Sequence, residues 1–376
     1  MAAPSLSRDR LRHLAELRPT SGKVISAFLN LDPSEFATGA ARATAITSLL
    51  TDASHRIDRA EHLEHAERIA LKEDVERVRE VLQGPDLAQN QTRGIAVYAC
   101  GPADLLEVVR LPQPVESRIV LDDSPFVEPL VSAADADRWC VLITTRRDAR
   151  VFHGTAESLE EMERFTGAEG DSVEDRATQH TTDRAAEQHL RAVGERLSRL
   201  LKAQPFDCLL VGAPDEIAGQ VEAALHPYVR ERLCGRVHVD WENATGREVT
   251  AAAAPVIEQH RSDRERSALD RFAQEAGRGG RAAAGLGPVL EALNEHRVEL
   301  LLLEDGFRAG GAIETTTGLL TVDGGNAPVD DPQFEGRDDI VESAIERAVE
   351  QSADVLVIRR FPDLRAHGGI GALLRF

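Results

Sequence analysis

A stretch of polar and basic residues near the middle of the chain carries the side chains with the most binding chemistry. The candidate binding residues are Arg176, Gln179, His180, Thr181, Thr182 and Arg184. Arginine can pair with phosphate through its planar guanidinium group and can stack on nucleic-acid bases. A simpler alternative is that Thr181 or Thr182 caps the N-terminus of the helix that follows.

The charge around these residues is balanced, in contrast to the chain as a whole. The chain has 64 acidic and 44 basic side chains and a formal net charge of −20, so RNA phosphate repels it at long range. Between Asp171 and Lys202, by contrast, acidic and basic residues are equal in number. The basic ones are Arg176, Arg184, Arg191, Arg196, Arg199 and Lys202. The segment is therefore positive relative to the rest, although interleaved charges are also typical of a solvated helix face.

The composition indicates several domains and excludes some classes of protein. A length of 376 residues allows two or three domains with separate cores. The four cysteines lie far apart, which favours core thiols over a disulfide framework or a zinc site. The N-terminal residues carry charges throughout, so we expect no signal peptide and a cytoplasmic location. The longest apolar runs, such as 300–303, are too short to span a membrane.

Familiar catalytic and metal-binding patterns are missing from the sequence. It contains no GxSxG nucleophile motif, no HExxH zinc motif and no P-loop. His62 and His65 have helical spacing, but no third or fourth ligand is evident, so a chance pair is favoured over a zinc site. We therefore predict no catalytic residue, no metal and no cofactor.

Residues 1–125 are expected to form an N-terminal α/β domain. A strand is predicted over 24–31, where apolar residues predominate. The apolar residues of 39–82 recur at steps of three and four, which indicates two amphipathic helices. Two further apolar runs, 94–100 and 105–111, predict a pair of strands joined by a glycine-proline turn.

Residues 126–277 are expected to form a middle domain, which opens with a β-hairpin over 139–154. A polar stretch from about 167 to 182 follows, and then an amphipathic helix with an apolar stripe. The stripe consists of Ala186, Leu190, Val193, Leu197 and Leu200. The remaining predicted elements are a strand over 208–212, a helix over 215–225, a strand over 236–240 and a long helix over 255–276.

Residues 278–376 are expected to form a C-terminal domain, which begins after a glycine-rich hinge. A helix running into a buried strand is predicted within 285–307, and another strand over 354–359. The chain then ends on Gly-Gly-Ile-Gly and a short apolar strand. Glycine-rich sequence allows a sharp backbone turn, so we interpret the ending as a tight turn that returns an edge strand to its sheet. The predicted fold class is α/β, with three α/β domains.

The ending, the segment 285–307 and the order of elements in 126–277 together resemble the archaeal and eukaryotic release factor 1/Pelota family, in the form carried by its bacterial members. This resemblance implies that the middle domain is release-factor-like and the last is L7Ae-like. It implies the ribosome as partner, with a translational GTPase as a further partner, and it implies neither a membrane nor DNA. It also implies that the first domain reaches toward the decoding centre, yet no codon-reading motif is found in residues 1–125.

The chain departs from this family at the loop that carries its catalytic tripeptide, Gly-Gly-Gln. In the family, the two glycines allow an unusual backbone and the glutamine helps to place the water that attacks the peptidyl-tRNA ester. The expected position here, 167–182, contains no such tripeptide, and the pair Gly219-Gln220 lies within a predicted helix. In this respect the chain resembles the Balon-type factors, which occupy the ribosomal A site in hibernation. This implies that Gln179 and His180 contact ribosomal RNA.

We therefore expect a ribosome-associated translation factor that occupies the A site without catalysis, in dormancy or stress. The first alternative is a peptidyl-tRNA hydrolase for peptide release or ribosome rescue, in which Gln179 replaces the missing glutamine. The second is an acidic adaptor that binds proteins away from the ribosome, which agrees best with the net charge of −20.

Overall fold

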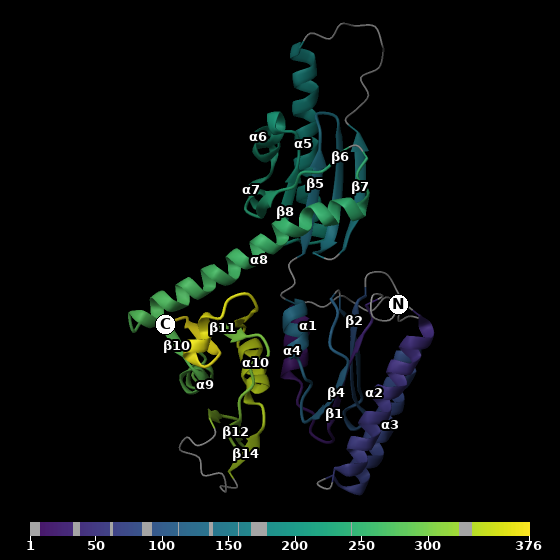
Figure 1. Ribbon diagram of the computed structural model, residues 1–376, viewed down its shortest axis with the longest axis vertical. Coiled ribbons are helices and arrows are strands. Elements are labelled where there is room, and N and C mark those ends of the chain that lie inside the picture. The colour runs from purple at the N-terminus through teal and green to yellow at the C-terminus, as the bar shows by residue number, and fades with distance from the viewer. Residues whose placement is uncertain are drawn as a thin grey trace. The chain divides into compact units, whose positions relative to one another are not determined.

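The computed structural model describes residues 8–32, 38–60, 63–84, 92–111, 113–134, 138–156, 158–166, 179–241, 243–322 and 333–376. The chain divides into two compact units (Figure 1). Unit 1 comprises residues 1–135 and 265–376, and unit 2 comprises residues 136–264. Both contain sheets and helices, so the predicted α/β class is confirmed. The domain boundaries expected near 125 and 277 stay predictions.

A four-stranded antiparallel sheet of order β3-β2-β1-β4 forms the N-terminal part of unit 1. Alternate residues of a strand point to opposite faces, and every residue of β1 is buried because both faces of the sheet are covered. Helices α2 and α3 pack on one face, and α1 and α4 on the other. These elements are β1 (Val24–Asn30), β2 (Gly94–Cys100), β3 (Leu105–Leu111), β4 (Arg118–Asp122), α1 (Arg8–Glu16), α2 (Gly39–Arg59), α3 (His65–Gln83) and α4 (Glu128–Ala134). The predicted strands and helix pair are confirmed.

A second four-stranded sheet, of order β10-β16-β11-β15, forms the C-terminal part of unit 1. Its strands are β10 (Ala282–Ala284), β11 (Val298–Glu304), β15 (Asp354–Ile358) and β16 (Ile370–Leu374). The glycine turn before β16 is confirmed, because Gly368 and Gly369 both have positive φ, at 69° and 83°. The prediction of an edge strand is wrong. β16 pairs with β10 on one side and β11 on the other, and the three alanines of β10 give too weak a strand signal to reveal this.

Helices cover both faces of this second sheet. One face packs on α9 (Leu286–Asn294) and α10 (Ile340–Glu350). The other packs on Leu269 and Phe272, in the last turns of the long helix α8 (Gly246–Gly277). A small antiparallel sheet lies between β11 and α10 in the sequence and consists of β12 (Gly311–Glu314), β13 (Leu320–Val322) and β14 (Phe334–Arg337).

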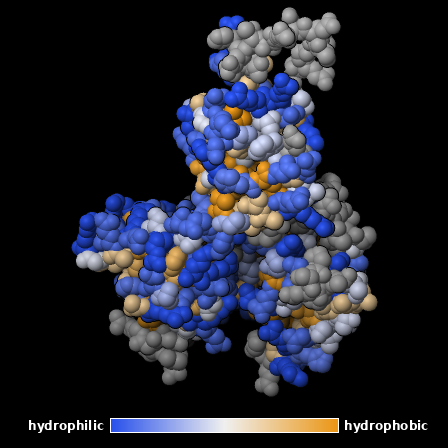
Figure 2. Space-filling view, turned by 45° about the horizontal axis from the view of Figure 1, so that its top comes forward, coloured by the Kyte–Doolittle hydropathy of each residue, from blue (hydrophilic) through white to orange (hydrophobic). Residues whose placement is uncertain are grey.

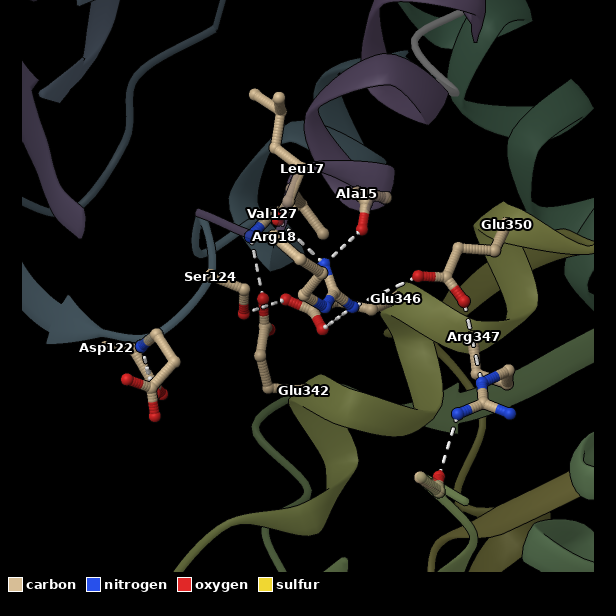
Figure 3. Close-up of polar contacts among 12 residues, drawn as sticks. Ala15, Leu17, Arg18, Asp122, Ser124, Val127, Glu342, Glu346, Arg347 and Glu350 are labelled. Carbon is tan, nitrogen blue, oxygen red and sulfur yellow. Dashed lines mark hydrogen bonds and ion pairs between the residues drawn. The ribbon is translucent and has the colours of Figure 1, made fainter. Parts of the chain in front are cut away.

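Helix α10 also joins the two parts of unit 1 through a buried polar cluster (Figure 3). Glu346 accepts hydrogen bonds from Arg18 Nη2 at 2.8 Å and from the Ser124 hydroxyl at 2.7 Å. One turn earlier, Glu342 accepts a hydrogen bond from the Val127 amide at 2.7 Å, while its second carboxylate oxygen is buried without a hydrogen-bond partner among the described residues. Burial raises the pKa of Glu346 to about 7 and raises that of Glu342 well above its ordinary value.

Unit 2 contains a five-stranded mixed sheet of order β7-β6-β5-β8-β9. Strands β5, β6 and β7 are antiparallel, and β8 and β9 continue the sheet in parallel. Helices α5 to α7 cover one face, and the first turns of α8 cover the other. The elements are β5 (Trp139–Thr144), β6 (Asp148–Thr155), β7 (Ser158–Thr166), α5 (Gln179–Ala203), β8 (Cys208–Gly212), α6 (Asp215–Ala224), α7 (Pro227–Arg230) and β9 (Leu233–Arg236).

Three details of unit 2 correct the predictions from sequence. Strand β7 was missed because its glutamates and arginine give no alternating apolar pattern. The strand predicted over 236–240 is wrong, since β9 ends at Arg236. The long helix begins at Gly246 rather than at Pro255, because a proline that usually opens a helix here lies inside one.

The outer surface is largely polar, as the 29% of charged residues suggests. On the face in Figure 2, hydrophilic residues predominate and hydrophobic ones occur in small groups. Among the described helices, none has the length and apolar character needed to cross a membrane.

Candidate functional site

The candidate site is one end of the unit 2 sheet (Figure 1). At this end the β5-β6 hairpin turns, β7 ends and α5 begins. We call it the loop end, and define it by the turn residues 145–148, Thr166 at the end of β7, and the first turns of α5 from Gln179. Asp148 pairs with Thr166 across β6 and β7, so these strand ends are neighbours. Helix α5 extends beyond the ends of these strands (Figure 1).

The β5-β6 turn is held by Thr145. Its amide donates to the Asp148 carbonyl at 2.8 Å, and its hydroxyl accepts from the amides of Arg147 and Asp148 at 3.2 and 3.0 Å. Threonine is favoured at this place because its side chain satisfies turn amides that the sheet cannot. The turn presents Arg146 and Arg147 as exposed side chains.

Helix α5 is positioned by its apolar stripe, as predicted. Ala186, Leu190, Val193 and Leu197 are buried, and Leu200 is partly buried against the same core. Gly194 lets α5 approach α6 closely, since a Cβ at this residue would lie 2.3 Å from the Ala224 carbonyl oxygen. The spacing of the stripe and this one close contact set the direction in which α5 leaves the sheet.

An aromatic cluster supports α5 near the loop end. The ring of His189 is buried, and its centroid lies 5.8 Å from that of Phe165. The Arg196 guanidinium lies 4.2 Å from the centroid of Phe165 on β7 and is paired with Glu163. Burial lowers the pKa of His189, partly opposed by the nearby backbone and carboxylate of Asp148. The imidazole is therefore neutral at neutral pH and acts as a packing group.

The structure places five of the six predicted site residues. Gln179, His180, Thr181 and Thr182 form the first turn of α5, and Arg184 follows as an exposed side chain. The polar stretch expected to continue to residue 182 therefore ends before Gln179, and Thr181 and Thr182 lie inside the helix rather than at its N-cap. Arg176 lies outside the described residues. Within the described residues, Arg184 forms no ion pair.

Two arginines of the β5-β6 turn also belong to this site, although they were not among the residues predicted for it. The buried His189 lies beside Asp148, so Arg184 is about 7.5 Å further along the α5 axis than the level of the turn. Arg146, Arg147 and Arg184 are thus exposed at one end of unit 2, with Asp148 as an exposed acidic neighbour. Their signal in the sequence is an Arg-Arg pair in a hairpin turn, and only the sheet topology brings it to the same end as α5.

The described side chains exposed at the loop end include three guanidinium groups, and the possible metal cluster of unit 2 lies elsewhere. The described residues hold one cluster that suits a metal ion, Cys208, Cys234 and His260. It belongs to the α8 face of the sheet, while α5 covers the opposite face. Exposed guanidinium groups at the loop end suit an anionic partner such as phosphate.

Comparison with protein families gives one match. Residues 138–297 match the family described as Bacterial archaeo-eukaryotic release factor family 3. The matched range contains the whole loop end, including the turn after β5 and all of α5. Among curated proteins, nothing matches this chain.

Several solved structures of release-factor and Pelota proteins are distantly similar. S. cerevisiae Dom34, a translation termination-like factor, is 12% identical over 75% of this chain and 79% of its own, with a TM-score of 0.44. Archaeoglobus fulgidus Pelota is 15% identical over 100% of this chain and 93% of its own, with a TM-score of 0.33. The C-terminal domain of a peptide chain release factor from Methanosarcina mazei is 25% identical over 36% of this chain and 98% of its own, with a TM-score of 0.27. These likenesses are loose, and the family match over 138–297 is the stronger finding.

Proposed function

We propose that this chain, which is similar to the bacterial archaeo-eukaryotic release factors, is a translation factor that binds the ribosome without hydrolysing peptidyl-tRNA. The support for binding is the family match across unit 2. The support for the lack of catalysis is the sequence itself, which contains no Gly-Gly-Gln. In this proposal the chain retains the fold of the family's middle domain and lacks its reactive tripeptide.

The missing tripeptide carries the proposal because the reaction depends on it. Hydrolysis of peptidyl-tRNA needs a water molecule held in line with the ester, and positioning of this kind supplies several kcal/mol of catalysis, about 7 or more in the best cases. Gln179 is the one glutamine of the polar segment 167–182, and it lies in the first turn of α5 with no glycine beside it. A helical backbone at Gln179 leaves it without the conformational freedom that paired glycines provide.

The loop end supplies the RNA-binding groups in this proposal. Arg146, Arg147 and Arg184 are exposed there, and a guanidinium group binds phosphate oxygens in a fixed planar geometry. A net charge of −20 works against any RNA contact at long range. Binding therefore depends on these few local arginines, together with Gln179 and His180.

Within the ribosome we propose the A site as the binding position and dormancy or stress as the occasion. Both extend the resemblance to family members that lack the tripeptide. The L7Ae-like C-terminal domain would then be the part that contacts a translational GTPase or the stalk region of the large subunit.

The proposed RNA contacts are tested by replacing two arginines at once, Arg147→Ala and Arg184→Ala, in the full chain. We expect the affinity for vacant 70S ribosomes to fall about 10-fold or more. The affinity should also depend less on salt, because fewer phosphate contacts mean that fewer counterions are released on binding. The matched control is Arg247→Ala, an exposed arginine of α8 in the same unit. Equal affinity of the double variant and the control would contradict the assignment of the loop end.

A further inference from the structure

Two cysteines and a histidine that are far apart in the sequence meet on the α8 face of the unit 2 sheet. Cys208 is the first residue of β8, Cys234 lies in the neighbouring strand β9, and His260 lies on α8. The Cys208 sulfur lies 3.3 Å from His260 Nε2, although the two residues are 52 positions apart. The two sulfurs and one ring nitrogen all lie within 4.8 Å of one another.

This arrangement results from the way the elements pack. β8 and β9 are parallel neighbours, and both cysteines belong to the face that α8 covers. On α8, the buried residues Val249, Ala253 and Ile257 form a stripe along that face, and His260 continues the stripe by three residues. The three side chains therefore point into one place without any motif in the sequence.

The distances are close to those of a zinc site. For tetrahedral zinc, Zn–S bonds of about 2.3 Å and Zn–N bonds of about 2.0 Å put ligand sulfur and nitrogen roughly 3.5 Å apart and two sulfurs roughly 3.8 Å apart. The Cys208–His260 separation of 3.3 Å already agrees, and the cysteine sulfurs need to approach by about 1 Å at most.

The surroundings also suit a metal ion. Cys208 is buried, while Cys234 and His260 are partly exposed, so the cluster lies at the rim of the core with access from solvent. The His260 ring packs edge-on against Trp139, with ring centroids 5.4 Å apart, which restricts its orientation. Among the described residues no fourth His, Cys, Asp or Glu joins the cluster, and two cysteines, one histidine and a water form a known zinc coordination.

We propose that Cys208, Cys234 and His260 bind a zinc ion, with the fourth coordination position open to water. The ion would join the paired strands β8 and β9 to α8, which packs on them through apolar contacts. This inference is independent of ribosome binding. The competing explanation is a plain hydrogen bond between the Cys208 thiol and the His260 ring, with no metal.

Cobalt serves as the first probe because it occupies zinc sites and gives a visible and near-ultraviolet spectrum. The full-length reduced protein, freed of metal by a chelator, should bind one Co²⁺ per chain with an intense sulfur-to-cobalt charge-transfer band. One equivalent of Zn²⁺ should abolish the band. Zinc should also raise the thermal midpoint of unit 2, because a ligand that binds only the folded state stabilises it. Both tryptophans, Trp139 and Trp241, lie in unit 2, so their fluorescence reports this unfolding.

Single variants identify the ligands. Cys234→Ala and His260→Ala should each weaken Co²⁺ binding by at least about 100-fold, more than the loss of an outer hydrogen bond would cause. The controls are Cys140→Ala, a buried cysteine on the opposite face of the same sheet, and His238→Ala, an exposed histidine. Cys234 is partly exposed, so its variant should fold, and native tryptophan emission verifies this. Absence of the charge-transfer band in the reduced protein, or equal binding by variants and controls, would overturn the proposal.

Discussion

At the scale of single residues, the geometry of the loop end of unit 2 depends on buried residues that would not themselves contact RNA. Gly194 determines how closely α5 approaches α6, and His189 fills the space between α5 and the sheet. The exposed residues that would contact RNA are held in place by these buried ones. Both buried residues therefore lead to predictions about stability.

We expect Gly194→Ala to destabilise unit 2 by roughly 1–3 kcal/mol, the usual cost of overpacking. The new Cβ would lie 2.3 Å from the Ala224 backbone oxygen, which cannot rotate away as a side chain could. The gain in helix propensity from alanine, about 1 kcal/mol, is smaller. Urea unfolding followed by tryptophan fluorescence measures the change.

The matched control is Gly219→Ala, a helical glycine of α6 with open space around its Cβ position. Here only the propensity gain applies, so the control should stabilise unit 2 by about 0.5–1 kcal/mol. Equal effects at the two glycines would show that α5 and α6 are further apart than the structure indicates.

The second prediction at this scale concerns pH. Burial lowers the pKa of His189 below its ordinary value of 6.5, so below that pH the unfolded chain binds more protons at this residue than the folded chain does. The free energy of unfolding of unit 2 should therefore decrease as the pH falls from about 6.5, by at most about 1.4 kcal/mol per pH unit. His189→Leu should reduce this slope. His153, whose pKa burial also lowers, should keep its own contribution in that variant.

The sequence identified part of the site at residue level. The helical spacing of the α5 stripe was enough to predict Ala186, Leu190, Val193 and Leu197 as buried. Arg146 and Arg147 could not be assigned, because β7 was not recognised and only its pairing with β6 brings the turn beside α5. Cys208, Cys234 and His260 lie on three separate elements, and their meeting depends on how those elements pack.

At the scale of elements, the pattern of apolar residues predicts well whether a segment is a helix or a strand. It predicts poorly which elements lie next to each other. β16 was recognised as a strand, yet its central position depends on β10, whose three alanines are as typical of a helix. Helix α8 passes through Pro255 in spite of the missing amide and continues to Gly277. Burial of Val249 and Ala253 on one side of Pro255 and Ile257 on the other accounts for this, since packing outweighs the local preference.

Helix α10 leads to a third prediction. Burial raises the pKa of Glu346 from an ordinary 4.5 to about 7, so the folded chain binds more protons here than the unfolded chain between these values. The stability of unit 1 should therefore decrease as the pH rises from about 4.5 through 7. The loss should be roughly 1–3 kcal/mol, with the neighbouring buried Glu342 adding to it.

Calorimetry of Glu346→Gln at about pH 5 and pH 8 checks this prediction. The amide should raise the unfolding temperature at pH 8 and leave it nearly unchanged at pH 5. The control is Glu350→Gln, which also removes a carboxylate paired with Arg18, at 3.0 Å, but from a more exposed side chain. A Glu346→Gln variant that behaves like Glu350→Gln would show that burial does not hold a proton on Glu346.

At the scale of the whole molecule, two features of the chain act in opposite directions. The ribosome binding that we propose from the family match over 138–297 requires contact with RNA, while a net charge of −20 repels RNA. The two are compatible if contact is limited to a small basic surface, which the loop end offers. The affinity for ribosomes should therefore decrease as the salt concentration rises. The slope of log affinity against log salt concentration should be shallow, because few phosphates are neutralised.

The central claim is binding without hydrolysis, and one paired measurement tests it most directly. The purified chain is sedimented with 70S ribosomes that carry peptidyl-tRNA, across a series of salt concentrations, and release of peptide is measured in the same samples. We predict that the chain sediments with ribosomes at low salt and releases no more peptide than ribosomes alone. Release that is abolished by Gln179→Ala would contradict the claim and establish a hydrolase, and no sedimentation at any salt concentration would leave an acidic adaptor away from the ribosome.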